Sequence, residues 1–257
     1  MVAKLNKYNN TLTMARRCLI LSKRNPDTLL TSVMLPALMM LLFVSLYGNI
    51  IHVGDTSYVN YIVPGVLLQC IGQCSSTTAI MMNKDTTSGI VGRFCTLPIK
   101  KAAILKGHIL EAFFRNILTS VIVLIVAMPV GFRPSADFMD WCIVLVLLIG
   151  IILAMSWLSV IVGIAANSAE GASSFSALAI VLPYLSSGFV PTQMLPRIIR
   201  SFAEHQPMTP IIETMRNALL GKPLEMDMLI TALLWCMGLL MVFYFMASAL
   251  FKKRFNN

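Results

Sequence analysis

The chain has 257 residues, of which 57% are hydrophobic and only 12% are charged, with a formal net charge of +9 and a mean hydropathy of +0.79. Soluble domains are about 25% charged, so this composition excludes an ordinary soluble fold and indicates an integral membrane protein built from helices. The basic residues follow the loops and form no single patch with interleaved aromatics, so we expect lipid headgroups as the counter-charge and no nucleic-acid partner.

The six cysteines predict neither disulfides nor a metal site. Cys18 and Cys95 fall in segments predicted to be cytoplasmic, where thiols stay reduced. Cys70 and Cys74 are one helical turn apart, but no His or acidic residue joins them. Buried cysteine ordinarily acts as a small hydrophobe, so we expect no metal in this chain.

Residues 1–27 predict a basic amphipathic helix lying in the plane of the lipid headgroups. Apolar positions recur at spacings of three and four, which places on one helical face Leu5, Tyr8, Leu12, Ala15 and Leu19. Lysines and arginines occupy the other positions. The same pattern also fits a helix that packs against soluble protein.

Six apolar segments predict an all-α integral membrane fold with six transmembrane helices in a single domain, residues 1–257. The predicted spans cover residues 29–50, 58–82, 109–130, 141–164, 172–189 and 228–250. Fourteen Lys and Arg residues fall in the predicted inner segments and five in the outer ones. This bias predicts that both termini lie on the cytoplasmic side of a cell membrane.

Two connecting segments are long enough to carry structure of their own. Residues 190–227 contain several prolines and are too broken to span the membrane, so they predict short re-entrant helices in the outer leaflet. Residues 83–107 are a polar, basic interruption and are predicted to face the cytoplasm. In this loop Asp85, Thr86, Thr87 and Ser88 are expected to cap a short helix that ends near Cys95. We interpret the loop as a handle for a cytoplasmic partner, the alternative being a solvated connector.

Polar residues inside the predicted spans are few. Glu111 and Arg115 stand at i and i+4, which predicts a structural ion pair at the membrane boundary. Gln69 and Gln73 are a turn apart and are expected to face another helix or a wet cavity. The chain contains no phosphate-binding GxxxxGK[ST] loop and no nucleophile constellation. An energy source must therefore come from elsewhere, or none is used.

Three groups of residues follow one another in a fixed order along the chain. The first group leads from Arg24-Asn25-Pro26 to Pro36 and Tyr47-Gly48. The second comprises Asp85, Gly89, Arg93, Thr96-Leu97-Pro98 and Leu105-Lys106-Gly107. The third runs through Ser187-Gly188-Phe189-Val190-Pro191, Leu195-Pro196, Pro207-Met208-Thr209-Pro210 and Arg216-Asn217-Ala218-Leu219-Leu220-Gly221. In order and spacing these groups resemble the type-2 ATP-binding-cassette exporter permeases, and most closely the daunorubicin-exporter type.

The resemblance implies a non-catalytic permease that pairs with a second copy or a sister chain above two cytoplasmic ATPase subunits, which alone bind ATP and magnesium. It implies that the inner loop is a coupling helix whose contacts with the ATPase include Asp85, Gly89, Arg93 and Phe94. The expected cargo is a hydrophobic drug, peptide or lipid-like molecule moved out of the cell. Residues expected to line its path are Gln69, Gln73, Tyr47 and Tyr184. The alternatives are a lipid-linked glycan exporter with the same fold and an ion-coupled secondary carrier.

Overall fold

The computed structural model describes residues 7–48, 50, 56–97, 99 and 101–255, leaving out the side chains of residues 7–9 and 175–178. The described residues form helices joined by turns. In chain order the helices are α1 (Lys7–Lys23), α2 (Pro26–Tyr47), α3 (Tyr58–Thr87), α4 (Ile90–Cys95), α5 (Lys101–Val130), α6 (Phe138–Ala165), α7 (Ala169–Val181), the 3-10 helix η1 (Thr192–Met194), α8 (Arg197–His205), α9 (Met208–Leu219) and α10 (Met226–Phe255).

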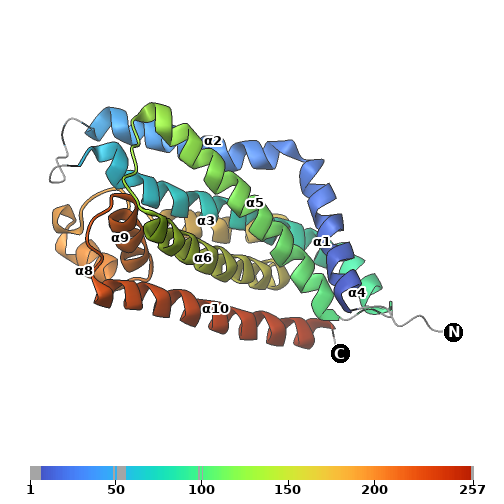
Figure 1. Cartoon of the computed structure of the whole chain (residues 1–257). Coiled ribbons are helices and arrows are strands. Elements are labelled where there is room, and N and C mark those ends of the chain that lie inside the picture. Colours follow the sequence, from blue (N-terminus) through green and yellow to red (C-terminus); the bar gives the residue numbers. More distant parts are fainter. Residues whose placement is uncertain (1–6, 49, 51–55, 98, 100, 256–257) are drawn as a thin grey trace.

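Long helices packed side by side form the body of the molecule (Figure 1). Helices α3 and α6 lie at its centre and contact each other, and α5, α7 and α9 pack against α3. Helices α2 and α10 lie at the periphery. In the most apolar 18-residue stretch of each helix, only 17% and 11% of the residues, respectively, are buried. Their exposed residues are large and apolar, so these two helices need a lipid or protein environment.

Four helices, α2, α5, α6 and α10, are long and apolar enough to cross a membrane among the described residues. This supports a multi-pass helical membrane protein. The other two predicted spans differ: α3 has thirty residues but carries many polar side chains, and α7 has only thirteen residues. The count of six spans therefore stays a prediction.

The helix bounds correct several predicted positions. The first apolar helix begins at Pro26, because proline is well suited to the first turn of a helix, and it ends at Tyr47. The segment 83–107 contains the end of α3, the short helix α4 and the start of α5, with residues 98 and 100 outside the description. The predicted helix cap was wrong: α3 continues through Thr87, and Gly89 precedes α4 with a φ of 74°. Only glycine adopts that left-handed conformation without strain.

The two ends of the bundle differ (Figure 1). Helix α4, the start of α5 and the C-terminal end of α10 lie together at one end, whereas α8 and α9 lie at the other. The Lys101 ammonium donates a hydrogen bond of 3.0 Å to the carbonyl of Phe255, which joins α5 to α10 at the α4 end. The predicted outer segment, residues 190–227, thus forms η1, α8 and α9 at the end away from α4.

Helix α1 packs against α5. Its buried residues are Asn10, Ala15, Cys18 and Ser22. Leu12 and Leu19, which were predicted to share a face with Ala15, are 67% and 38% exposed. Ala15 packs inside the bundle, whereas Leu12 and Leu19 are left for lipid to cover, so the contact of this face with the headgroups stays a prediction. Leu5 and the Tyr8 side chain lie outside the described residues.

Candidate functional site

The chain reverses direction at the end of α3, and the short helix α4 occupies the turn. Gly89 allows the sharp change of direction, and a Cβ built there would meet no atom within 4 Å. Val91 is fully buried and holds α4 against the bundle, whereas Arg93 is exposed and Phe94 is half-buried. The packing therefore presents Arg93 on a short helix that is anchored on its other side.

A buried carboxylate ties α3 to two neighbouring helices. Asp85 is only 7% exposed and accepts hydrogen bonds of 2.6 and 2.8 Å from the two terminal nitrogens of Arg17 on α1. The Nε2 atom of His108 on α5 lies 3.2 Å from the same carboxylate. Cys18 lies next to this cluster, with its sulfur 3.8 Å from Nδ1 of His108. We call Arg17, Asp85 and His108 the anchor cluster.

Electrostatics favour the charged form of the anchor cluster. Asp85 lies beyond the span predicted for residues 58–82. Burial by itself raises the pKa of its carboxyl group, but the interactions with Arg17 and His108 outweigh burial and hold the pKa well below its usual range. The hydrogen bond to Asp85 in turn raises the pKa of Arg17. A bidentate arginine–carboxylate pair also fixes orientation, so the cluster sets how α1 lies against α3.

The anchor cluster extends to α4 and to the start of α5. The guanidinium carbon of Arg17 lies 5.2 Å from the ring centroid of Phe94, within the range of a cation–π contact. Helices α1 and α5 approach closely at Gly107, where an added Cβ would lie 2.6 Å from the Cβ of Met14. Thus α1, α3, α4 and α5 meet in one contact network at this end of the bundle.

The structure separates the four residues predicted to contact a cytoplasmic partner. Gly89 and Arg93 lie on the surface of the turn, and the Phe94 ring contacts the guanidinium of Arg17. Asp85 is occupied by intramolecular partners and supports the turn from inside. Sequence reasoning missed Arg17 and His108 as partners of Asp85. The available signal was a carboxylate beside an apolar span, which requires a nearby cation.

The four predicted path residues come from α2, α3 and the turn after α7. Tyr47 and Tyr184 both stack on Phe43, with ring centroids 5.6 and 5.9 Å apart. Gln69 on α3 is 1% exposed, and Gln73 is partly buried one turn further on. The tyrosines belong to an aromatic cluster around Phe43, and the Gln69 side chain lies close to the Tyr184 hydroxyl.

A buried arginine fastens the opposite end of the bundle. Arg216 on α9 is 8% exposed and donates hydrogen bonds to the carbonyls of Tyr61, at 3.0 Å, and Ser187. Its guanidinium carbon lies 3.6 Å from the centroid of the Tyr61 ring. The Tyr61 hydroxyl also donates to the Ser187 carbonyl, at 2.9 Å. Arg216 thus joins α9 to α3, a contact that sequence reasoning did not predict.

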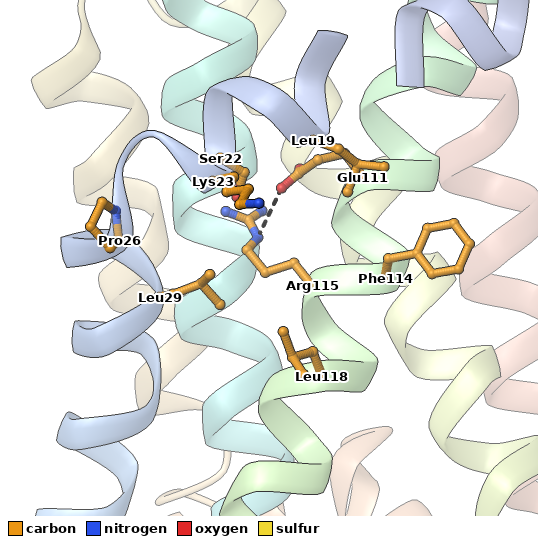
Figure 2. Close-up of a pocket in the computed structure, with 9 residues that line it drawn as sticks. All are labelled: Leu19, Ser22, Lys23, Pro26, Leu29, Glu111, Phe114, Arg115 and Leu118. Atoms are coloured by element: carbon orange, nitrogen blue, oxygen red, sulfur yellow. Dashed lines mark ion pairs between the residues drawn. The ribbon is translucent and has the colours of Figure 1, made fainter. Parts of the chain in front are cut away.

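The predicted ion pair between Glu111 and Arg115 is confirmed, with 3.4 Å between Oε1 and Nε. The two side chains line a cavity of about 460 Å³ between α1, α2 and α5 (Figure 2). Arg115 also donates through Nη2 to the Cys74 carbonyl, at 3.2 Å, and to the Thr78 hydroxyl, at 2.5 Å. The pair is more deeply buried than predicted, since Glu111 is 0% and Arg115 3% exposed.

Groups of three His, Cys, Asp or Glu that could hold a metal ion are absent from the described residues. The cysteines one turn apart, Cys70 and Cys74, each contact a residue of a neighbouring helix. The Cys70 thiol donates to the Ser32 carbonyl at 3.4 Å, and the Cys74 sulfur lies 3.3 Å from the Thr119 hydroxyl. Both thiols therefore join α3 to its neighbours.

Comparison with known proteins gives consistent matches over most of the chain. The family model described as ABC-2 type transporter matches residues 9–220. The daunorubicin resistance ABC transporter permease protein DrrB1 of Streptomyces coeruleorubidus is 25% identical over 240 residues, covering 93% of this chain and 82% of its own length. The probable doxorubicin resistance ABC transporter permease protein DrrC of Mycobacterium tuberculosis is 28% identical over 249 residues, covering 90% of this chain and 84% of its own length.

Proposed function

Because the chain belongs to the ABC-2 type transporter family and is the membrane-spanning permease subunit of an ABC exporter, we propose that α4 is the helix through which a separate ATPase drives it. The observation that carries this proposal is the exposure of Arg93 on a short helix whose other contacts are internal. ATP and magnesium bind to the ATPase, and this chain binds neither.

The anchor cluster makes α4 suitable for transmitting movement. Asp85 belongs to the last turn of α3, Arg17 to α1 and His108 to α5, so a displacement of α4 moves three helices together. Helix α3 is also fixed to α6, because Asn83 donates to the carbonyl of Ala166 at 2.6 Å. In this mechanism the ATPase pair closes on ATP, α4 moves as a rigid handle, and the permease changes the side to which its path opens. Such coupling requires different contacts in the two states.

The proposed assembly contains two ATPase subunits and two permeases, either two copies of this chain or this chain with a sister. Helices α2 and α10 expose large apolar residues that lipid and a second permease would cover. We place the α4 end, with both termini, in the cytoplasm. The support is the excess of Lys and Arg in the segments predicted to lie at that end.

The proposed cargo is a hydrophobic drug or a similarly apolar molecule moved out of the cell. Two relatives carry daunorubicin and doxorubicin resistance in their names, and aromatic rings cluster around Phe43 where α2 ends. A lipid-linked glycan would use the same fold and is the second candidate. The matches to ABC permeases do not favour an ion-coupled carrier.

Co-purification with the ATPase tests the coupling assignment. The chain and its ATPase are expressed together, solubilised in mild detergent and purified through a tag on the permease. Arg93→Glu should lose the ATPase, whereas Arg197→Glu should retain it because Arg197 is exposed at the opposite end. Equal retention in both variants would reject α4 as the docking helix without affecting the family assignment.

A further inference from the structure

The cavity that contains Glu111 and Arg115 has a polar end and an apolar end. Figure 2 shows Lys23 beside Arg115 and Glu111 near α1, while Leu29 and Leu118 line the cavity further along α2 and α5. A second cavity of about 540 Å³ continues between the same two helices. It shares residues with the first and adds Asp27, Leu30, Val33 and Ile122. The two cavities form a groove for an elongated amphiphile, which we call the α2–α5 groove.

The polar end of the groove contains buried groups whose hydrogen-bonding capacity is unused. Neither carboxylate oxygen of Glu111 accepts a hydrogen bond among the described residues, and the Nε and Nη1 atoms of Arg115 donate none. Their mutual contact of 3.4 Å is an ion pair without hydrogen-bond geometry. A buried charged group without hydrogen-bond partners is destabilising, so these atoms favour a ligand that brings both acceptors and donors.

We infer that the α2–α5 groove binds a phospholipid with a phosphoethanolamine headgroup, drawn from the leaflet that borders α1. The phosphate would accept hydrogen bonds from Arg115 and Lys23, and the primary ammonium would donate to Glu111. The acyl chains would lie along the apolar part of the groove past Leu29 and Leu118. Two cations and two carboxylates line the groove, Asp27 being the second carboxylate, and this balance matches a zwitterion.

Headgroup chemistry makes the inference selective. Phosphocholine has the same two charges, but its quaternary ammonium has no N–H group to donate to Glu111. Phosphoglycerol offers the phosphate and hydroxyl donors, but no cation to balance Glu111. The groove should therefore prefer ethanolamine lipid over both. A hydrogen bond to a charged partner is worth about 1.5–3 kcal/mol, which corresponds to a preference of about tenfold or more.

Native mass spectrometry of the full chain measures this preference directly. The protein is purified in mild detergent and titrated with phosphatidylethanolamine, phosphatidylcholine or phosphatidylglycerol of identical acyl chains. We expect one ethanolamine lipid to be retained at least about tenfold more strongly than either competitor. Equal retention of the three lipids, or stronger retention of phosphatidylglycerol, would overturn the inference.

Three variants locate the site. Glu111→Gln should abolish the preference over phosphatidylcholine, and Leu118→Trp should block binding of all three lipids by filling the groove. Lys23→Gln tests the site even if Glu111→Gln fails to fold, because Lys23 is exposed and its replacement should not disturb folding. It should weaken binding about tenfold. Lys253→Gln, an exposed lysine outside the groove, is the control and should bind normally. Lipid retention that Lys23→Gln and Leu118→Trp leave unchanged would place the lipid elsewhere and reject the site.

Discussion

The anchor cluster makes a quantitative prediction about α1. Replacing Arg17 by methionine keeps the apolar stem but removes two charge-assisted hydrogen bonds to Asp85. Hydrogen bonds to charged groups contribute about 1.5–3 kcal/mol. The Arg17 side chain is 28% exposed, so solvent screening reduces its contribution. We expect α1 to detach from α3, and with it from α5, more easily by about 2 kcal/mol, which is about a thirtyfold rise in the detached population.

The thiol of Cys18 reports this detachment. Cys18 is 2% exposed, on the face of α1 that packs against α5, so it reacts with a maleimide only when α1 moves away. When α1 recloses faster than the reagent reacts, the labelling rate follows the open population. The assay uses a background with Cys95→Ser and Cys142→Ser, because those two cysteines are partly exposed. Arg17→Met should then raise the rate of Cys18 labelling about thirtyfold.

Arg16→Met is the matched control, because Arg16 is the neighbouring arginine on α1 and is exposed. It removes the same charge without touching Asp85. If Arg16→Met accelerated labelling of Cys18 as much as Arg17→Met, net charge and not the anchor cluster would hold α1. An unchanged rate in Arg17→Met would show that packing alone positions the helix.

Two further predictions concern the joints at either end of the bundle. Gly107→Ala should destabilise the α1–α5 contact by about 1–3 kcal/mol through the clash with Met14. Gly92→Ala should not destabilise the protein, because no atom lies within 4 Å of its added Cβ and alanine favours the helix in which Gly92 lies. The thermal midpoint in detergent distinguishes the two variants, and equal midpoints would contradict the close approach. Arg216→Met should lower that midpoint by removing about 2–4 kcal/mol from the attachment of α9. Exposed Arg197→Met is its control, and a midpoint that falls equally in both variants would contradict the assigned role of Arg216.

Much of the helical architecture followed from hydrophobicity, but helix ends and buried faces did not. Apolar runs located α2, α5, α6 and α10 because lipid-facing segments must be both long and apolar. The end of α3 was placed too early because Asp85 was treated as a loop residue. Asp85 remains in the helix with its carboxylate buried, because Arg17 and His108, distant in the sequence, compensate the charge. The sequence signals that a cation must lie near Asp85 but does not say which distant residue supplies it.

The candidate site shows the same division between local and distant information. The pair of Glu111 and Arg115 was predictable because an i, i+4 spacing is local. The groove around the pair was not, because α1, α2 and α5 come together there only in the folded chain. The apolar pattern of α1 is local in the same way. An amphipathic pattern identifies an apolar face but does not say whether lipid or another helix covers it.

Helix α3 is the element that joins the two ends of the molecule. Asp85 attaches it to α1 near α4, and Tyr61 attaches it to Arg216 of α9 at the other end. These positions are separated by about 36 Å along a helix that rises 1.5 Å per residue. Most of α3 is buried, and close-packed interiors transmit displacement instead of absorbing it. A movement imposed on α4 should therefore reach α9 as a tilt or shift of the whole helix, which links the proposed ATPase contact to the far end of the bundle.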